Sequence, residues 1–168
     1  MGSLLATKLR RPTVPPRRVE RPHLHQRLNE GLALSRRVTL VSAPAGFGKT
    51  TSVSEWVDGL DLPVTWLSLE PADDDPGRFF AYLVAALQKV DPTLGRELEE
   101  VLRSGQLPPG DVIVTVLINE ILEGDRRFLL VLDDFQVVQD RSILQVLERL
   151  LTSPPPPLHL VLITREDP

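Results

Sequence analysis

The chain has 168 residues and no cysteine, so it is long enough for one domain with a buried core, and disulfide frameworks and thiolate metal sites are excluded. The hydrophobic fraction of 42% and the charged fraction of 25% are ordinary for a globular protein. No apolar run approaches the roughly 20 residues that span a bilayer, and the first residues lack a signal-peptide pattern. We therefore expect a cytoplasmic protein with no membrane partner.

The net charge of −4 conceals a positively charged first segment. Residues 1–37 carry nine Lys and Arg against two Glu. Within them, residues 1–22 are rich in Pro and Arg and are expected to form an extended arm before a domain of residues 23–168. The arm can bind nucleic acid or an acidic partner. It can also lie solvated against the acidic remainder of the chain, which we favour because no aromatic side chains stand between the arginines to stack on bases.

After the arm, helical and strand-like segments alternate. Helices are predicted at residues 23–34, 50–59, 76–91, 94–105, 112–124 and 141–151, and strands at 37–43, 63–70, 127–135 and 158–166. Asp75 and Asp111 are predicted to cap the helices that follow them, and Trp56 and Trp66 to lie in the core. The near-continuous apolar strands indicate an α/β fold with a mostly parallel sheet between two layers of helices. The phosphate-loop motif described next makes this fold the P-loop NTPase type. We expect the strand order 2-3-1-4, with strand four at an edge.

The stretch SAPAGFGKTT, residues 42–51, is typical of a phosphate-binding loop, G-x-x-x-x-G-K-[ST], between a strand and a helix. In such a loop, backbone N–H groups and the positive end of the helix face phosphate oxygens. Lys49 is expected to reach the β and γ phosphates, and Thr50 to bind Mg²⁺. The predicted nucleotide contacts are Pro44, Ala45, Gly46, Phe47, Gly48, Lys49, Thr50 and Thr51. Ala43 replaces the first glycine, which is tolerable if its φ is negative; a glycine-rich turn with a chance GKT is the alternative.

A second motif, FLLVLDDF at residues 128–135, is an apolar strand that ends in two carboxylates. Asp133 is predicted to hold Mg²⁺ through a water, and Asp134 to orient or deprotonate the attacking water. Without the phosphate loop upstream, a helix-capping turn would be the simpler interpretation. Arg165 follows the last strand, where it can reach the γ-phosphate or pair with a surface acid. The three aspartates at 73–75 can be a metal cluster, but helix capping is favoured.

The segments APAGFGKTT, LDDF and ITRED, with the flanking VTWLSLEPADDDPGRFFAYLVAAL, together resemble the STAND class of signal-transduction P-loop ATPases. The bacterial branch of MalT-like, LuxR-type transcriptional activators is the most similar. The resemblance implies a site for ATP or ADP with Mg²⁺, in a switch that oligomerises on binding ATP and an inducer. It implies that the segment before the first helix packs on the adenine, which maps onto Val19, Glu20, Arg21 and Pro22. It also implies that this is an N-terminal fragment, with a fifth strand and a C-terminal DNA-binding domain outside it.

We therefore expect a Mg²⁺-dependent ATP-binding switch module of low turnover, with Lys49, Asp134 and Arg165 as its catalytic groups. Two alternatives remain open. A small-molecule kinase on the same fold would need a lid rich in arginine, and the linker at 104–110 carries no arginine cluster. An interaction module with a vestigial site would need no catalysis. An unpaired strand four would favour self-association through that edge or through a swapped terminus.

Overall fold

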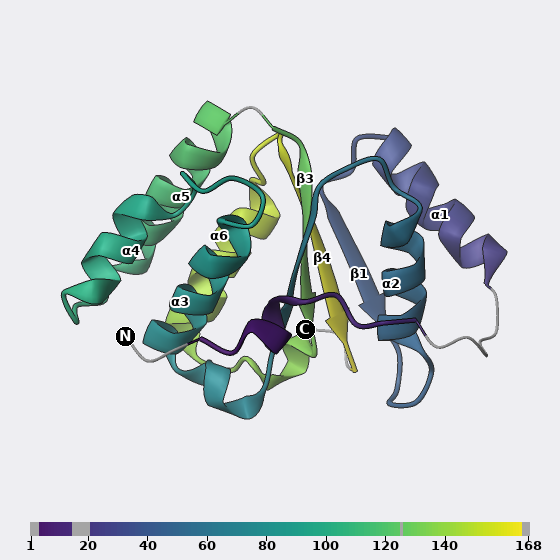
Figure 1. Ribbon diagram of the computed structural model, residues 1–168, viewed down its shortest axis with the longest axis horizontal. Coiled ribbons are helices and arrows are strands. Elements are labelled where there is room, and N and C mark those ends of the chain that lie inside the picture. The colour runs from purple at the N-terminus through teal and green to yellow at the C-terminus, as the bar shows by residue number, and fades with distance from the viewer. Residues whose placement is uncertain (1–3, 15–20, 125, 166–168) are drawn as a thin grey trace.

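The computed structural model describes residues 4–14, 21–124 and 126–165, which form a four-stranded sheet between two layers of helices (Figure 1). The strands are β1 (Val38–Ser42), β2 (Val64–Ser68), β3 (Phe128–Asp133) and β4 (Leu158–Thr164). All neighbouring strands are parallel, so their carboxyl ends meet at one edge of the sheet. The predicted α/β class with a mostly parallel sheet is confirmed. In the described ranges, no helix has the length and apolar character needed to cross a membrane.

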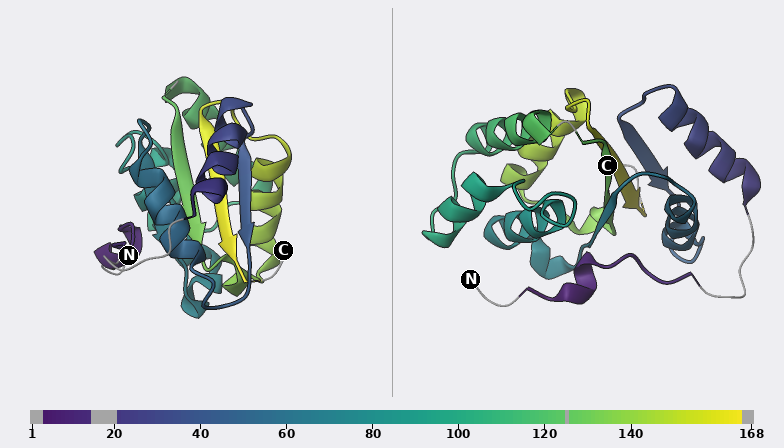
Figure 2. Two further views of the ribbon diagram at one scale, coloured as in Figure 1. Left: turned by 90° about the vertical axis from the view of Figure 1, so that its right-hand side faces the viewer. Right: turned by 45° about the horizontal axis from the view of Figure 1, so that its top comes forward.

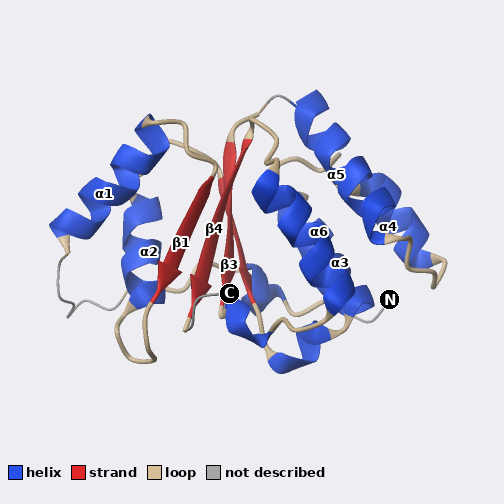
Figure 3. Ribbon diagram, turned by 180° about the vertical axis from the view of Figure 1, so that it is seen from behind, coloured by secondary structure: helices blue, strands red, loops and turns tan. Residues whose placement is uncertain are grey.

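The helices divide into two groups, one on each side of the sheet (Figure 3). One side carries α1 (Pro22–Ala33) and α2 (Lys49–Asp58), and the other carries α3 (Pro76–Leu87), α4 (Arg96–Arg103), α5 (Gly110–Gly124) and α6 (Arg141–Thr152). Three short 3₁₀ helices are η1 (Ala6–Leu9), η2 (Pro71–Asp74) and η3 (Phe135–Val137). Each side of the sheet has its own apolar cluster. Trp56 and Trp66 lie buried in the cluster on the α1–α2 side, as predicted.

The strand order is β1-β4-β3-β2, so the predicted order 2-3-1-4 is wrong. Strand β4 pairs with both neighbours, with Leu162 opposite Leu40 of β1 and Leu132 of β3. Every residue of β4 is buried, whereas those of β1 are half-buried or exposed. A strand that is covered on both faces and has partners at both edges leaves no backbone polar group unpaired in the core, which explains the central place of β4. The expected self-association through an edge at strand four therefore has no basis in this sheet.

The starts of two helices test the predicted caps. Asp75 precedes α3, and its carboxylate accepts a hydrogen bond from the backbone N–H of Arg78 at 2.8 Å, so this cap is confirmed. Asp111 is the second residue of α5 and does not cap it, because the helix begins at Gly110, directly after Pro109. The carboxylate of Asp111 lies in the first turn of α5, where its negative charge interacts favourably with the positive end of the helix dipole.

Residues 4–14 run past the outer edge of β2, from α3 towards α2 (Figures 1 and 2). The ammonium of Lys8 is buried and pairs with the fully buried carboxylate of Asp73. Arg11 pairs with Asp58 of α2 at 2.6 Å. These residues therefore lie against the acidic remainder of the chain, which was the favoured interpretation, but Lys8 is buried rather than solvated.

Candidate functional site

The predicted phosphate loop joins β1 to α2 at the carboxyl edge of the sheet. Gly46 and Gly48 have φ of +83° and +72°, a conformation that side-chain-bearing residues rarely adopt, so both glycines are needed for the shape of the loop. Ala43 is not among the positive-φ residues of the described chain, and its N–H donates to the carbonyl of Thr164 at 3.4 Å. A methyl group is therefore compatible with the place of the missing first glycine.

Helix α2 begins at the loop with its first turn uncapped by a side chain, since its N-cap is Gly48. Backbone N–H groups at such a helix start, together with the helix dipole, favour an anion. Lys49 lies at this start and donates to the loop's own carbonyls, to Ala43 and, at 3.0 Å, to Pro44. The loop thus places a cation beside a helix start that no side chain caps, and both features favour a phosphate group. The remaining predicted contacts are the exposed Pro44, Ala45 and Phe47 and the half-buried Thr51.

Thr50 and Asp133 meet where the first turn of α2 passes the end of β3. The hydroxyl of Thr50 donates to Oδ1 of Asp133 at 3.0 Å, and the backbone N–H of Asp134 donates to the same oxygen at 3.0 Å. Asp133 is only 4% exposed. Burial raises the pKa of its carboxyl to about 6; the charge of Asp134 adds to the shift, while the hydrogen bond from Thr50 opposes it. Because an unpaired charge is costly to bury, a bound cation would stabilise a carboxylate of this kind.

Asp134 and Arg165 form the outer part of the site. The two side chains pair at 3.5 Å, between Nη2 of Arg165 and Oδ1 of Asp134, and both are about half exposed. Asp134 has φ of +57°, in the left-handed region that aspartate tolerates better than most residues. Gln136, which the sequence reasoning did not single out, bonds to both: its Nε2 donates to Oδ1 of Asp134 at 2.8 Å, and its Oε1 accepts from the backbone N–H of Arg165 at 3.1 Å.

The segment before α1 also reaches the loop. A side chain at Gly48 would meet Nη2 of Arg21, 3.6 Å from the position of its Cβ, so the guanidinium lies against the phosphate loop. Pro22 is the first residue of α1. Val19 lies outside the described residues, and the predicted packing of this segment on adenine stays a prediction.

The three aspartates at 73–75 have separate structural tasks. Asp73 pairs with Lys8 and with Nε of Arg78, the latter at 2.8 Å. Asp74 accepts hydrogen bonds from two backbone N–H groups ahead of α6, and Asp75 caps α3. Across the described ranges, no group of three or more His, Asp or Glu side chains is arranged to hold a metal ion. The capping and pairing interpretation of this run accounts for all three carboxylates.

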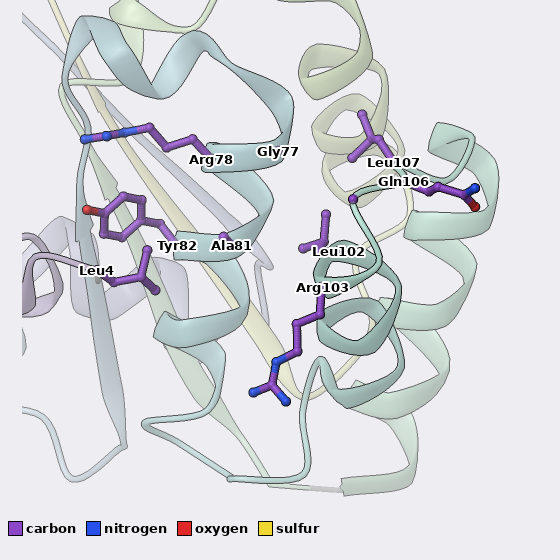
Figure 4. Close-up of a pocket in the computed structure, with 10 residues that line it drawn as sticks. Leu4, Gly77, Arg78, Ala81, Tyr82, Leu102, Arg103, Gln106 and Leu107 are labelled. Carbon is purple, nitrogen blue, oxygen red and sulfur yellow. The ribbon is translucent and has the colours of Figure 1, made fainter. Parts of the chain in front are cut away.

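A cavity of about 490 Å³ lies away from the phosphate loop, between α3 and the end of α4 (Figure 4). Its walls include Ala81 and Tyr82 from α3 and Leu102 from α4, with Leu4 and Leu107 beside them. None of the predicted site residues lines it. The predicted nucleotide site and this cavity are therefore separate features of the fold.

Known proteins resemble this chain in sequence and in fold. No protein-family model matches the chain. Over 98% of its length the chain is 33% identical to the HTH-type transcriptional regulator MalT of Yersinia enterocolitica and 31% identical to that of Cronobacter sakazakii. The chain is a homologue of one segment of MalT. It spans only 18% of the length of these relatives.

Other relatives share less of this MalT-like segment. The serine/threonine-protein kinase PknK of Mycobacterium tuberculosis is 36% identical over 62% of the chain, which is 10% of PknK. Among solved structures, Cdc6p from Pyrobaculum aerophilum matches 92% of the chain and 41% of its own, with a TM-score of 0.61 and 18% identity. A Walker-type ATPase of Pyrococcus abyssi matches 86% of the chain and 45% of its own, with a TM-score of 0.52 and 16% identity. At these identities the structures show a shared fold.

Proposed function

We propose that the chain is the Mg²⁺-dependent ATP- and ADP-binding module of a STAND-class transcription regulator, with slow hydrolysis of ATP. The observation that carries the proposal is that the predicted site residues lie together in space. The glycine loop, the Thr50–Asp133 pair and the Asp134–Arg165 pair all lie at the carboxyl edge of the parallel sheet, although they come from three separate stretches of sequence. Ligands in open α/β sheets bind at this edge.

The oxygen donors at the site suit Mg²⁺. Thr50 and Asp133 offer a hydroxyl and a carboxylate, the hard donors that Mg²⁺ prefers, and Mg²⁺ takes only one or two protein ligands beside waters and phosphate oxygens. The raised pKa of Asp133 shows that its charge lacks sufficient compensation within the protein. Thr50 and Asp133 would therefore hold the ion, which would neutralise charge on the β and γ phosphates.

The other side chains divide the remaining work. Lys49 exchanges the carbonyls of Ala43 and Pro44 for phosphate oxygens. Asp134 orients the attacking water, and Arg165, at the end of β4, offsets charge on the γ-phosphate. Phosphoryl transfer depends on positioning and charge stabilisation. The paired and half-exposed Arg165 offers only modest stabilisation, which is consistent with low turnover.

The names of the relatives indicate the process in which the module would act, the regulation of transcription. We propose that the longer protein is a cytoplasmic regulator that contacts DNA through a different segment and self-associates under the control of the bound nucleotide. The support is the match to HTH-type transcriptional regulators over 98% of the chain. Light scattering of the full-length protein with ATP, with ADP and without nucleotide tests this; equal mass in all three states would contradict it.

Calorimetric titration with ATP and ADP, with and without Mg²⁺, tests the proposal. Lys49→Ala is expected to abolish binding, while Arg103→Ala, which removes a 64% exposed guanidinium on α4, is the matched control and should leave it unchanged. Retained binding in Lys49→Ala would contradict the assignment of the loop. With γ-labelled ATP, the label is expected in inorganic phosphate; recovery on a small metabolite would favour a kinase instead.

A further inference from the structure

Gln136 joins two side chains of the candidate site that lie on different strand ends. It belongs to η3, immediately after β3, and is held there between the buried Phe135 and the half-buried Val137. Its amide donates to the carboxylate of Asp134 and accepts from the backbone N–H of Arg165. The orientation of the amide is fixed by chemistry, because a carboxylate only accepts and a backbone N–H only donates.

The direct contact between the side chains of Asp134 and Arg165 is weak without this bridge. Their side chains are 45% and 55% exposed, and the direct contact between them is a long 3.5 Å. An exposed ion pair of this kind contributes little, since water competes for both partners and the side chains lose rotamer freedom. The two bonds of Gln136, at 2.8 and 3.1 Å, are shorter and come from an anchored turn.

The bridge also engages one particular oxygen of the Asp134 carboxylate. Both Gln136 and Arg165 bind Oδ1 of Asp134. Within the described residues the bonds to this carboxylate go to Oδ1 and none goes to Oδ2, and the side chain is 45% exposed. A carboxylate held by one oxygen presents the other in one direction, which is what orientation of a water requires.

We propose that Gln136 is a positioning residue: its side-chain amide orients the carboxylate of Asp134 and fixes the backbone of Arg165 relative to the γ-phosphate of a bound nucleotide. The inference rests on the proposed function. In the described part of the chain, the hydrogen bonds of the Gln136 side chain go to Asp134 and Arg165, and none goes to the phosphate loop or to the Thr50–Asp133 pair. On the proposed function, that loop and that pair hold the parts common to ATP and ADP. Loss of Gln136 therefore weakens hydrolysis and the preference for ATP, and leaves the affinity for ADP unchanged.

Two variants separate the two bonds. Gln136→Leu removes both with little change of volume, whereas Gln136→Glu keeps an oxygen for the N–H of Arg165 and places a second carboxylate against Asp134. Gln145→Leu, on the exposed face of α6, is the matched control. Hydrogen exchange of the Arg165 amide in the nucleotide-free protein reports the bridge: protection is expected in wild type and in Gln136→Glu, and is lost in Gln136→Leu.

Single-turnover hydrolysis and equilibrium titrations complete the test. Both Gln136 variants are expected to hydrolyse ATP on the order of 10- to 100-fold more slowly than wild type, with ADP affinity unchanged and the ATP-to-ADP affinity ratio reduced. A merely structural bridge would instead leave Gln136→Glu near the wild-type rate, because that variant keeps the bond to Arg165. Unchanged hydrolysis in both variants would overturn the role of Gln136 alone. Absence of nucleotide binding in the wild type would overturn the proposed function, and this positioning role with it.

Discussion

Replacing Asp133 by asparagine is expected to stabilise the nucleotide-free protein while it removes the response to Mg²⁺. The carboxyl group is 4% exposed, and burial raises its pKa from the ordinary 3.8 to about 6. That difference corresponds to about 3 kcal/mol, the cost of keeping this carboxylate charged in the folded state at neutral pH. Asparagine avoids the charge and still accepts, through Oδ1, the hydrogen bonds from Thr50 and from the backbone of Asp134.

The sign of the pH dependence follows from proton binding. Between pH 3.8 and about 6 the folded protein keeps the proton of Asp133 and the unfolded chain has lost it, so stability falls as pH rises through this window. Lys49 and Asp134 are the charged groups that act on Asp133; the first opposes the shift and the second adds to it. His159 has a lowered pKa caused by burial, so its contribution rises with pH, but it is present in both proteins and cancels in their difference.

The assay is denaturant unfolding in EDTA at about pH 4 and about pH 7.5, with wild type, Asp133→Asn and the exposed control Asp61→Asn. Asp133→Asn is expected to be more stable than wild type by about 1–3 kcal/mol at the higher pH, because the new amide NH₂ offsets part of the gain by needing partners of its own. This advantage should shrink by about 2 kcal/mol at the lower pH, where the folded wild type keeps the carboxyl proton of Asp133. Adding Mg²⁺ and ATP should stabilise wild type and not the variant. A variant less stable than wild type at the higher pH would refute the reasoning.

Two further substitutions test other parts of the structure. Gly48→Ala imposes a side chain at φ +72° and brings a Cβ to 3.6 Å from Arg21. Thermal unfolding should therefore show a loss of about 1–2 kcal/mol in stability, and nucleotide binding should be weaker. The control Gly31→Ala, in open space on α1, should be neutral or stabilising. Lys8→Met leaves the buried carboxylate of Asp73 short of one partner and should cost about 2–4 kcal/mol in denaturant unfolding. Recovery in the double variant with Asp73→Asn is expected, and a cost equal to the sum of the single ones would contradict the pairing.

The parts of the site that could be predicted from the sequence are those with local causes. The loop from Ala43 to Thr50 is contiguous, and its glycines, lysine and flanking strand and helix are all visible in one stretch. The meeting of Thr50 with Asp133 follows once both strands are parallel, because their carboxyl ends then share an edge. Asp75 could be assigned as a cap because the proline after it starts a helix.

What could not be predicted depends on contacts between distant segments. Strand β4 contains His159, whose ring is buried in the fold and bonds to the hydroxyl of Thr39 at 2.8 Å and the carbonyl of Arg36 at 2.7 Å. These bonds join segments that are far apart in the sequence, so the place of β4 beside β1 could not be predicted from local patterns. Lys8 likewise reads as one more charge of a basic arm until Asp73, far along the chain, is brought beside it.

The polar groups of the candidate site bond to one another. Lys49 is bonded to loop carbonyls, Thr50 to Asp133, and the outer carboxylate to Gln136 and Arg165. On the proposed function, nucleotide binding would exchange these internal hydrogen bonds for bonds to phosphate, so the net gain from each neutral hydrogen bond would be small. The exception is the buried carboxylate of Asp133, whose charge the protein compensates only in part. On the proposed function, most of the gain on binding should then come from the charges of Mg²⁺ and Lys49, and the neutral hydrogen bonds of the loop should contribute little.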